Sequence, residues 1–461
     1  MSESLSRRDF LRLTGAGAAA ALGAPLLANR AFAAPRPARK PNIIYIMADD
    51  LGYGDLGCYG QKKILTPRLD RMAVEGMRFT DFYSAAPVCA PARRSLLTGM
   101  HGGHSTCRAN NPSVGMKAGE VTVAEILKKA GYATGVVGKW AEGVEKSSGA
   151  PNKQGFDYWF GVPQSRGHGY YHWRLWKNGK MTTGRENPEQ QKHHATNLYT
   201  DEAVGFIKRN KDKPFFLYVP LQAPHFDYQV PKDALKPYAD KPWDAKQKAF
   251  AALVTLMDRN VGRILDTLKE LDLDENTVVL FTSDNGPSFT TSYKFWGSCG
   301  GLSGIKRSLN EGGIRVPMIV RWPGRIKPRT TCSEPFAGYD FLATAASLAG
   351  VEPPKTDGVS FLPALLGKKQ TPHEFLYWES HERNKLVAVR KGKWKLIRDW
   401  RKKKWGPYLY DLEKDPGERK NRANVEPEIV SKLAAIVRRE HTPSREKNWQ
   451  LPVEWVKNEA E

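Results

Sequence analysis

Residues 89–99 (CAPARRSLLTG) combine a cysteine, a proline and arginines at spacings that favour chemistry. Pro91 suits the first turn of a helix, and residues 92–97 continue the helical pattern. We therefore expect Cys89 just before a helix N-terminus, where free N–H groups and the helix dipole favour an anion. Arg93 follows one helical turn later and brings a positive charge close to residue 89. On this segment alone, a buried structural cysteine or a redox thiol remains an alternative.

Oxygen-bearing side chains recur at two distant places in the chain. Asp49 and Asp50 follow one apolar run, and Asp284 and Asn285 follow another. Carboxylates gathered in one place repel each other and need a cation, and oxygen ligands suit Ca²⁺ or Mg²⁺ better than Zn²⁺. These four side chains, with Cys89, are therefore a candidate metal site. Helix capping at the first pair and an Asn-Gly turn at the second are the alternative.

Two lysines and a histidine are further candidates. Lys139 and Lys306 each follow a glycine-containing segment, and each can neutralise the oxygens of a bound anion. His225 follows an apolar run and can protonate a leaving alkoxide. The alternative for each lysine taken singly is a solvated surface charge, and the alternative for the histidine is a packed core residue.

Four apolar runs position these residues: 42–47, 133–137, 214–219 and 277–281. Continuous apolar runs are typical of strands buried on both faces of a parallel sheet. Helical patterns lie between them at 121–130, 203–208 and 249–271. Strands that alternate with helices predict a doubly wound α/β sheet. Ligands bind beyond the carboxyl ends of such strands, where the candidate residues lie.

The pattern changes from about residue 371. Residues 386–390 and 394–398 predict a β-hairpin, 408–412 a third strand, and 426–440 an amphipathic helix. We therefore expect a catalytic domain over residues 34–370. A small antiparallel α+β subdomain should follow over residues 371–461.

Residues 1–33 have the features of a twin-arginine export signal. Arg7 and Arg8 precede an uncharged stretch at 13–28, and residues 31–33 fit a small-x-small cleavage site. An N-terminal membrane anchor is the alternative, but the uncharged stretch is shorter than the about 20 residues that a bilayer requires. We expect a periplasmic or secreted protein with no membrane span.

Composition narrows the function further. The chain has 461 residues, of which 40% are hydrophobic and 10% aromatic, so a sizeable core is expected. Five cysteines are too few for a disulfide scaffold, and their pairing cannot be derived from sequence.

A net charge of +22 suggests a polyanionic partner. No nucleic-acid-binding motif is present. The basic run at 398–405 is either a saccharide subsite or a solvated loop.

Six motifs in order resemble those of the type I, formylglycine-dependent sulfatases, an arylsulfatase-like group of the alkaline phosphatase superfamily. The resemblance extends from Pro41 to about Arg422. Along the chain, the motifs are ADDLGYGD at 48–55, CAPAR at 89–93, GKW at 138–140, SDNG at 283–286, GIK at 304–306 with EGGIR at 311–315, and LYDL at 409–412 with Asp415-Pro416. The resemblance implies an alkaline-phosphatase-like fold, with a doubly wound mixed sheet.

The resemblance also implies a mechanism and a substrate. Cys89 would be oxidised to formylglycine by a formylglycine-generating or an anaerobic sulfatase-maturing enzyme, before export of the folded protein. One hydroxyl of the hydrated aldehyde would attack sulfur beside Ca²⁺, or less favourably Mg²⁺, and the other would expel sulfate. The remaining catalytic residues would be Arg93, Lys139, His225 and Lys306. The substrate would be a sulfated carbohydrate.

One position departs from the family pattern. Many members have histidine directly after Gly-Lys-Trp, whereas this chain has Ala141. In those members the histidine contacts the formylglycine hydroxyl and assists sulfate release. The resemblance therefore implies that this chain uses another base, relies on the pKa of the hydroxyl being lowered by the metal, or is slower. His168 is a candidate substitute or a substrate-binding residue, and His101 and His104 are weaker candidates.

Two other functions compete with the sulfatase hypothesis. A phosphate or phosphonate monoester hydrolase of the same superfamily can also use formylglycine. The second competing function is a non-catalytic protein that binds sulfated glycans on this scaffold. Ala141 favours it, because one expected catalytic group is missing.

Overall fold

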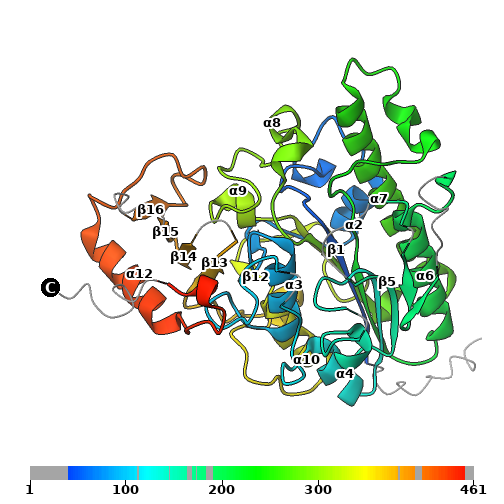
Figure 1. Cartoon of the computed structure of the whole chain (residues 1–461), viewed down its shortest axis with the longest axis horizontal. Helices are drawn as coiled ribbons and strands as arrows, with labels where there is room; N and C mark the ends of the chain where they lie inside the picture. The colour runs from blue at the N-terminus through cyan, green and yellow to red at the C-terminus, as the bar shows by residue number, and fades with distance from the viewer. Residues whose placement is uncertain are drawn as a thin grey trace, which may run out of the picture. The chain divides into compact units, whose positions relative to one another are not determined.

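A ten-stranded mixed sheet forms the centre of the computed structural model (Figure 1). The structure describes residues 40–111, 114–144, 146–163, 169–172, 174–182, 190–382, 385–399 and 407–451. The predicted export signal at 1–33, His168 and most of the basic run at 398–405 lie outside these residues.

The four predicted central strands are confirmed. They are β1 (Asn42–Ala48), β4 (Ala133–Lys139), β8 (Phe215–Pro220) and β9 (Thr277–Ser283). With β5 (Tyr158–Val162) they form the parallel order β9-β1-β8-β4-β5. All four carboxyl ends extend beyond the predicted limits, and Asp49, Asp50, Lys139, His225, Asp284 and Asn285 lie at or shortly after these ends.

Short strands complete both sides of the sheet. The antiparallel strand β10 (Met318–Arg321) joins β9 to β2 (Met77–Phe79), and β11 (Thr330–Cys332) lies at that edge. The opposite edge holds β6 (Trp176–Lys177) and β7 (Lys180–Met181). The mixed sheet expected from the family resemblance is confirmed.

Helices cover both faces of the sheet. Successive side chains of each strand point to opposite faces, so alternate residues pack against different helices. Ile44 and Ile46 of β1 pack with α2 (Pro67–Glu75), α6 (Ala195–Arg209) and α7 (Ala245–Glu270). Ile43 and Tyr45 pack on the other face with α3 (Cys89–Thr98), α4 (Val123–Lys129) and α10 (Asp340–Ala349). This two-sided burial explains the continuous apolar runs.

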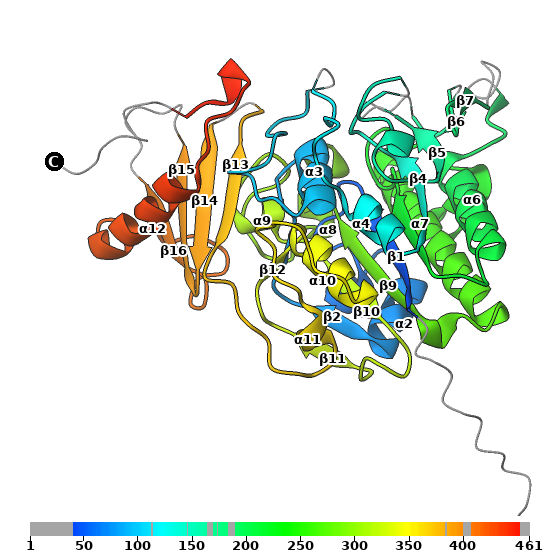
Figure 2. The same cartoon turned by 90° about the horizontal axis from the view of Figure 1, so that it is seen from below.

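A four-stranded antiparallel sheet forms the C-terminal part (Figure 2). Its strands are β13 (Leu376–Ser380), β14 (Leu386–Lys391), β15 (Trp394–Asp399) and β16 (Tyr408–Asp411). One face packs against α12 (Pro427–Glu440), and the other packs against residues around Tyr83 and Tyr339. The predicted hairpin, third strand and helix are confirmed, whereas β13 was not predicted. The domain boundary at residue 370 remains a prediction.

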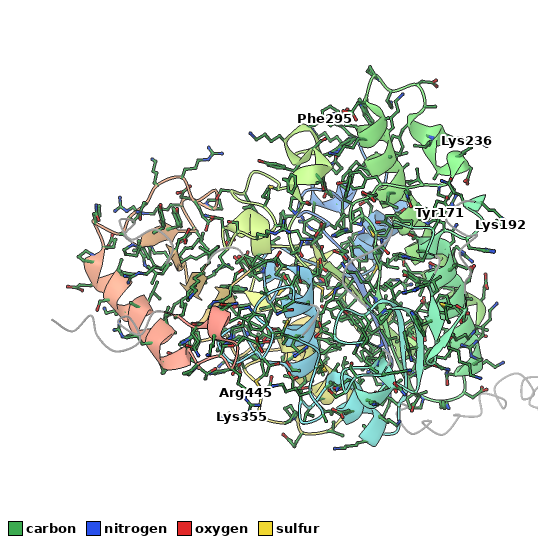
Figure 3. The ribbon with its side chains drawn as sticks, viewed as in Figure 1. Tyr171, Lys192, Lys236, Phe295, Lys355 and Arg445 are labelled. Carbon is green, nitrogen blue, oxygen red and sulfur yellow. The ribbon has the colours of Figure 1, made fainter. Side chains whose placement is uncertain are left out.

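Short elements connect these layers. They are β3 (Phe82–Tyr83), which pairs with β12 (Phe336–Ala337), and the helices α8 (Tyr293–Trp296), α9 (Glu311–Ile314) and α11 (Leu362–Leu365). Labelled lysines such as Lys192 and Lys236 lie at the periphery and are exposed (Figure 3). Within the described ranges, every helix is too short or too polar to cross a membrane.

Candidate active site

The signature segment forms helix α3, and Cys89 is its first residue. The prediction that Cys89 precedes the helix was wrong by one position. Val88 is the N-cap with extended backbone, and Pro91 still falls within the first turn, where a missing N–H costs no hydrogen bond. The backbone N–H of Ala90 donates to Asn110 Oδ1 at 2.9 Å. Cys89 therefore lies at the positive end of the helix dipole.

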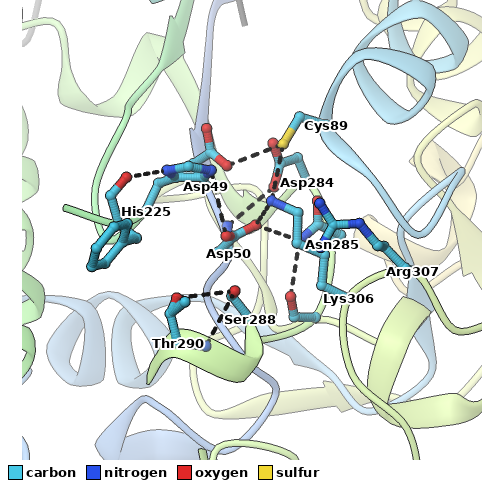
Figure 4. Close-up of polar contacts among 12 residues, drawn as sticks. Asp49, Asp50, Cys89, His225, Asp284, Asn285, Ser288, Thr290, Lys306 and Arg307 are labelled. Carbon is cyan, nitrogen blue, oxygen red and sulfur yellow. Dashed lines mark hydrogen bonds and ion pairs between the residues drawn. The ribbon is translucent and has the colours of Figure 1, made fainter. Parts of the chain in front are cut away.

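The carboxylates that follow β1 lie beside the side chain of Cys89 (Figure 4). Cys89 Sγ lies 3.3 Å from Asp49 Oδ1 and 3.4 Å from Lys306 Nζ. Lys306 Nζ also donates to Asp50 Oδ1 at 2.5 Å. Potential ligand atoms of Asp49, Asp50, Cys89 and His225 all lie within 4.8 Å of one another. Segments far apart in sequence thus meet around residue 89.

The residues after β9 complete this cluster. Asp284 Oδ1 accepts a hydrogen bond from the Asp50 backbone at 3.2 Å, and Asn285 Nδ2 donates to Asp50 Oδ1 at 2.7 Å. The Oδ1 atom of Asn285 is buried and has no hydrogen-bond partner among the described residues. An unsatisfied buried amide oxygen beside carboxylates is a donor set that fits a hard divalent cation.

Arg93 holds the two strand ends together. Its side chain is fully buried, and its Nη2 donates to Asp284 Oδ2 at 2.7 Å and to Asp49 Oδ2 at 3.3 Å. Its Nη1 donates to the Lys139 carbonyl at 2.8 Å. One guanidinium thus connects the carboxyl ends of β1, β4 and β9. Arg93 therefore holds the Asp49 and Asp284 carboxylates in place beside residue 89.

Both lysines are buried and charged. Lys139 Nζ forms an ion pair with Asp49, and Lys306 Nζ with Asp50. Burial alone would lower the pKa of each lysine, but the neighbouring carboxylates outweigh it and the pKa lies above its usual value. The two ammonium groups are therefore positioned to attract an anion.

The Cys89 thiol itself is a poor nucleophile. Burial and the nearby carboxylates Asp284 and Asp49 raise the pKa of the thiol far above its usual value. A reactive or redox thiol needs a lowered pKa, so this environment argues against the redox alternative.

His225 faces the carboxylates from the loop after β8. Its Nδ1 lies 2.5 Å from the Phe226 carbonyl, so this nitrogen carries the proton, and Nε2 lies 3.7 Å from Asp50 Oδ2. The hydroxyl of Tyr170 donates to the His225 carbonyl at 2.8 Å and to the Gln222 carbonyl at 3.0 Å. Sequence reasoning missed this role of Tyr170, because no spacing links it to His225.

The weaker histidine candidates lie elsewhere. His104 Nδ1 contacts Asp357 Oδ1 at 2.8 Å, and His101 Nε2 lies 3.4 Å from Glu440 Oε2. Neither histidine contacts the carboxylates around Cys89 in the described structure. Ala141 has a left-handed backbone (φ 69°), and its N–H donates to the Pro163 carbonyl at 3.2 Å.

A second arginine of the signature is structural. Arg94 is buried, and its Nε donates to Glu142 Oε2 at 2.5 Å. Burial raises the pKa of Glu142 to about 7, although Arg94 opposes that shift. Sequence reasoning missed this pair because Glu142 lies in a loop without a recognisable pattern.

The mixed sheet, with carboxylates after its parallel strands facing the start of α3, has an alkaline-phosphatase-like fold. A sulfatase family model matches residues 41–351. A second model, described as the N-sulphoglucosamine sulphohydrolase C-terminal region, matches residues 304–441. The chain belongs to the sulfatase family and is a sulfatase enzyme.

Similar proteins agree with this assignment. An N-acetylgalactosamine-6-O-sulfatase of Bacteroides thetaiotaomicron is 34% identical over 87% of this chain and 93% of its own length. An N-acetylgalactosamine-6-sulfatase of Canis lupus familiaris is 35% identical over 84% of this chain and 82% of its own. The solved structure of Ps i-CgsB with k-i-k-neocarrahexaose has a TM-score of 0.78 and 28% identity, covering 89% of this chain and 97% of that one.

Proposed function

We propose that this sulfatase hydrolyses a sulfate ester on a carbohydrate, using a formylglycine made from Cys89 and a bound Ca²⁺. The observation that carries the proposal is the position of Cys89, at the start of α3 and 3.3 Å from Asp49 Oδ1. The names of the relatives favour a sulfated sugar as the substrate.

Asp49, Asp50, Asp284 and Asn285 would hold the metal, with residue 89 facing it. Their oxygen atoms match the ligands that Ca²⁺ prefers, and the unsatisfied Oδ1 of Asn285 supports this assignment. When bound, Ca²⁺ would polarise the sulfate ester and stabilise a hydroxyl nucleophile. Mg²⁺ fits less well, because it needs a stricter octahedral geometry.

The side chains divide the remaining chemistry. A hydrated formylglycine supplies one hydroxyl to attack sulfur and a second whose loss of a proton releases sulfate. Lys139 and Lys306 neutralise the sulfate oxygens. His225, when protonated on both ring nitrogens, would keep its Nδ1 proton on the Phe226 carbonyl, give its Nε2 proton to the leaving oxygen and become neutral.

Maturation and export extend the proposal. A formylglycine-generating or anaerobic sulfatase-maturing enzyme would modify Cys89 in the cytoplasm, because the buried side chain is inaccessible after folding. The signal at residues 1–33 would then carry the folded protein to the periplasm or beyond.

Paired assays with an aryl sulfate and the matching aryl phosphate test this function. We expect kcat/KM to be at least about 100-fold higher for the sulfate, a difference of about 2.7 kcal/mol. Cys89→Ala should abolish turnover, whereas Cys332→Ala, in the edge strand β11, should not. A higher kcat/KM for the phosphate would reverse the proposal, and an active Cys89→Ala variant would refute the nucleophile.

A further inference from the structure

Arg307 follows the site lysine in an unusual backbone conformation. Its φ is 77°, a left-handed value that is strained for a non-glycine residue. Its backbone N–H donates to the Pro87 carbonyl at 2.9 Å, two residues before Cys89. Such conformations gather at functional sites, and here the bend lets consecutive side chains, Lys306 and Arg307, point to different surroundings.

Only one of the three nitrogen atoms of the Arg307 guanidinium has a partner among the described residues. Its Nε pairs with Glu382 Oε1 at 3.0 Å, and among the described residues its two Nη atoms have no partner. Glu382 Oε2 accepts from the Asn110 N–H at 3.3 Å, and Asn110 in turn caps Ala90. The guanidinium is thus held at a fixed place beside the site, next to Lys306 in Figure 4. Its free edge is a planar fork that matches a carboxylate or a sulfate.

A pocket of about 490 Å³ opens beside this arginine. Lys306 and Arg307 line one side, and the C-terminal sheet supplies Leu386, Ile397, Tyr408, Tyr410 and the acidic Asp399. The rings of Tyr408 and Tyr410 lie nearly parallel, 6.3 Å apart. Small-molecule pockets measure roughly 300–1,000 Å³, so there is room for a saccharide unit beyond the sulfate group.

We propose that this pocket binds the saccharide unit next to the cleaved sulfate ester, and that Arg307 pairs with an anionic group on that unit. The group is a carboxylate or a second sulfate ester, which share the geometry that a guanidinium recognises. The inference rests on the proposed sulfatase function and names its substrate class. That class is an oligosaccharide with negative charges on neighbouring units, consistent with a net charge of +22.

The test compares matched disaccharides that carry the same cleavable sulfate. One has a uronate carboxylate on the neighbouring unit, one has that carboxylate reduced to an alcohol, and one carries a second sulfate there. In the wild type, kcat/KM for an anionic disaccharide should exceed that for the reduced one about tenfold. Arg307→Gln should bring this ratio close to one, through a higher KM. Arg307→Lys should retain part of it, because lysine keeps the charge but loses the fork.

Arg259→Gln is the matched control, since Arg259 pairs with Asp233 on the exposed side of α7 and should leave the ratio unchanged. A wild-type ratio near one for both anionic disaccharides would overturn the inference, as would an unchanged ratio in Arg307→Gln. If the wild type releases no sulfate from an aryl sulfate either, the proposed function itself fails. If only one of the two anionic disaccharides is cleaved with a higher kcat/KM than the reduced one, the anionic group of that disaccharide is the one that Arg307 recognises.

Discussion

Arg93 shows how a single side chain sets up the site. It has no exposed surface, and it contacts carboxylates from β1 and β9 that would otherwise repel each other. A buried ion pair adds little net stability, but removing one partner leaves an uncompensated charge. The residue therefore matters to the fold and to the position of residue 89.

We predict that Arg93→Ala destabilises the metal-free protein by about 3–5 kcal/mol. The loss arises because Asp284 and Asp49 lose their shared guanidinium. Urea unfolding in the presence of a chelator measures it. Arg68→Ala is the control, since Arg68 and Asp266 are 37% and 47% exposed and their pair contributes under about 1 kcal/mol. Equal losses in the two variants would contradict this account of Arg93.

At the scale of elements, the loop that carries His225 depends on a neighbouring helix end. Tyr170, which holds the His225 carbonyl, stacks on His194 at the N-cap of α6, with ring centroids 5.0 Å apart. Burial lowers the pKa of His194 to about 4, and its Nε2 lies 3.0 Å from the Gln229 carbonyl. Above about pH 4, Tyr170 therefore stacks on a neutral imidazole.

This predicts a loss of stability in acid. The unfolded chain binds a proton at His194 below a pKa of about 6.5, whereas the folded protein does so only near pH 4. The free energy of unfolding should therefore fall by up to about 3 kcal/mol as the pH drops from 6.5 to 4. Denaturant unfolding at several pH values tests this.

His194→Phe keeps the ring and removes the titration, so its stability should depend less on pH over this range. His193→Phe, at the exposed neighbouring position, should retain the wild-type slope. If both variants follow the wild type, His194 does not control the acid response.

The length of a secondary-structure element decides whether the sequence pattern can predict it. The central strands were predictable because seven-residue apolar runs such as β1 are buried on both faces. Strands of two or three residues, such as β2 and β11, contain too few positions for a pattern. The polar residues after each long strand could be assigned together, because parallel strands end at one edge. The contacts of Tyr170 and the Arg94–Glu142 pair depend on tertiary packing and have no local signal.

At the scale of the whole molecule, a buried lysine links the C-terminal sheet to the segment that follows Lys306. Lys395 of β15 pairs with Glu311 at 2.7 Å and Glu418 at 3.0 Å, and all three are buried. Glu311 also accepts from the Tyr83 hydroxyl at 2.7 Å. The pocket beside Arg307 lies along the same junction, so its shape depends on this link.

We predict that Lys395→Met destabilises the protein by about 3–5 kcal/mol, because buried Glu418 loses its counter-charge and buried Glu311 keeps only its 3.3 Å pair with Arg315. Thermal unfolding provides the measurement. Lys391→Met removes a lysine from the neighbouring strand whose pair with Glu374 is half-exposed, so it should cost under about 1 kcal/mol. A Lys395→Met protein as stable as Lys391→Met would show that this ion cluster does not hold the sheet in place.

The central claim is that residue 89 acts as a formylglycine. Mass spectrometry of the peptide containing residue 89, taken from enzyme purified with full sulfatase activity, tests it most directly. We predict the mass of an aldehyde in place of the thiol, in a fraction of molecules that rises with specific activity. An unmodified cysteine in fully active enzyme would contradict the account.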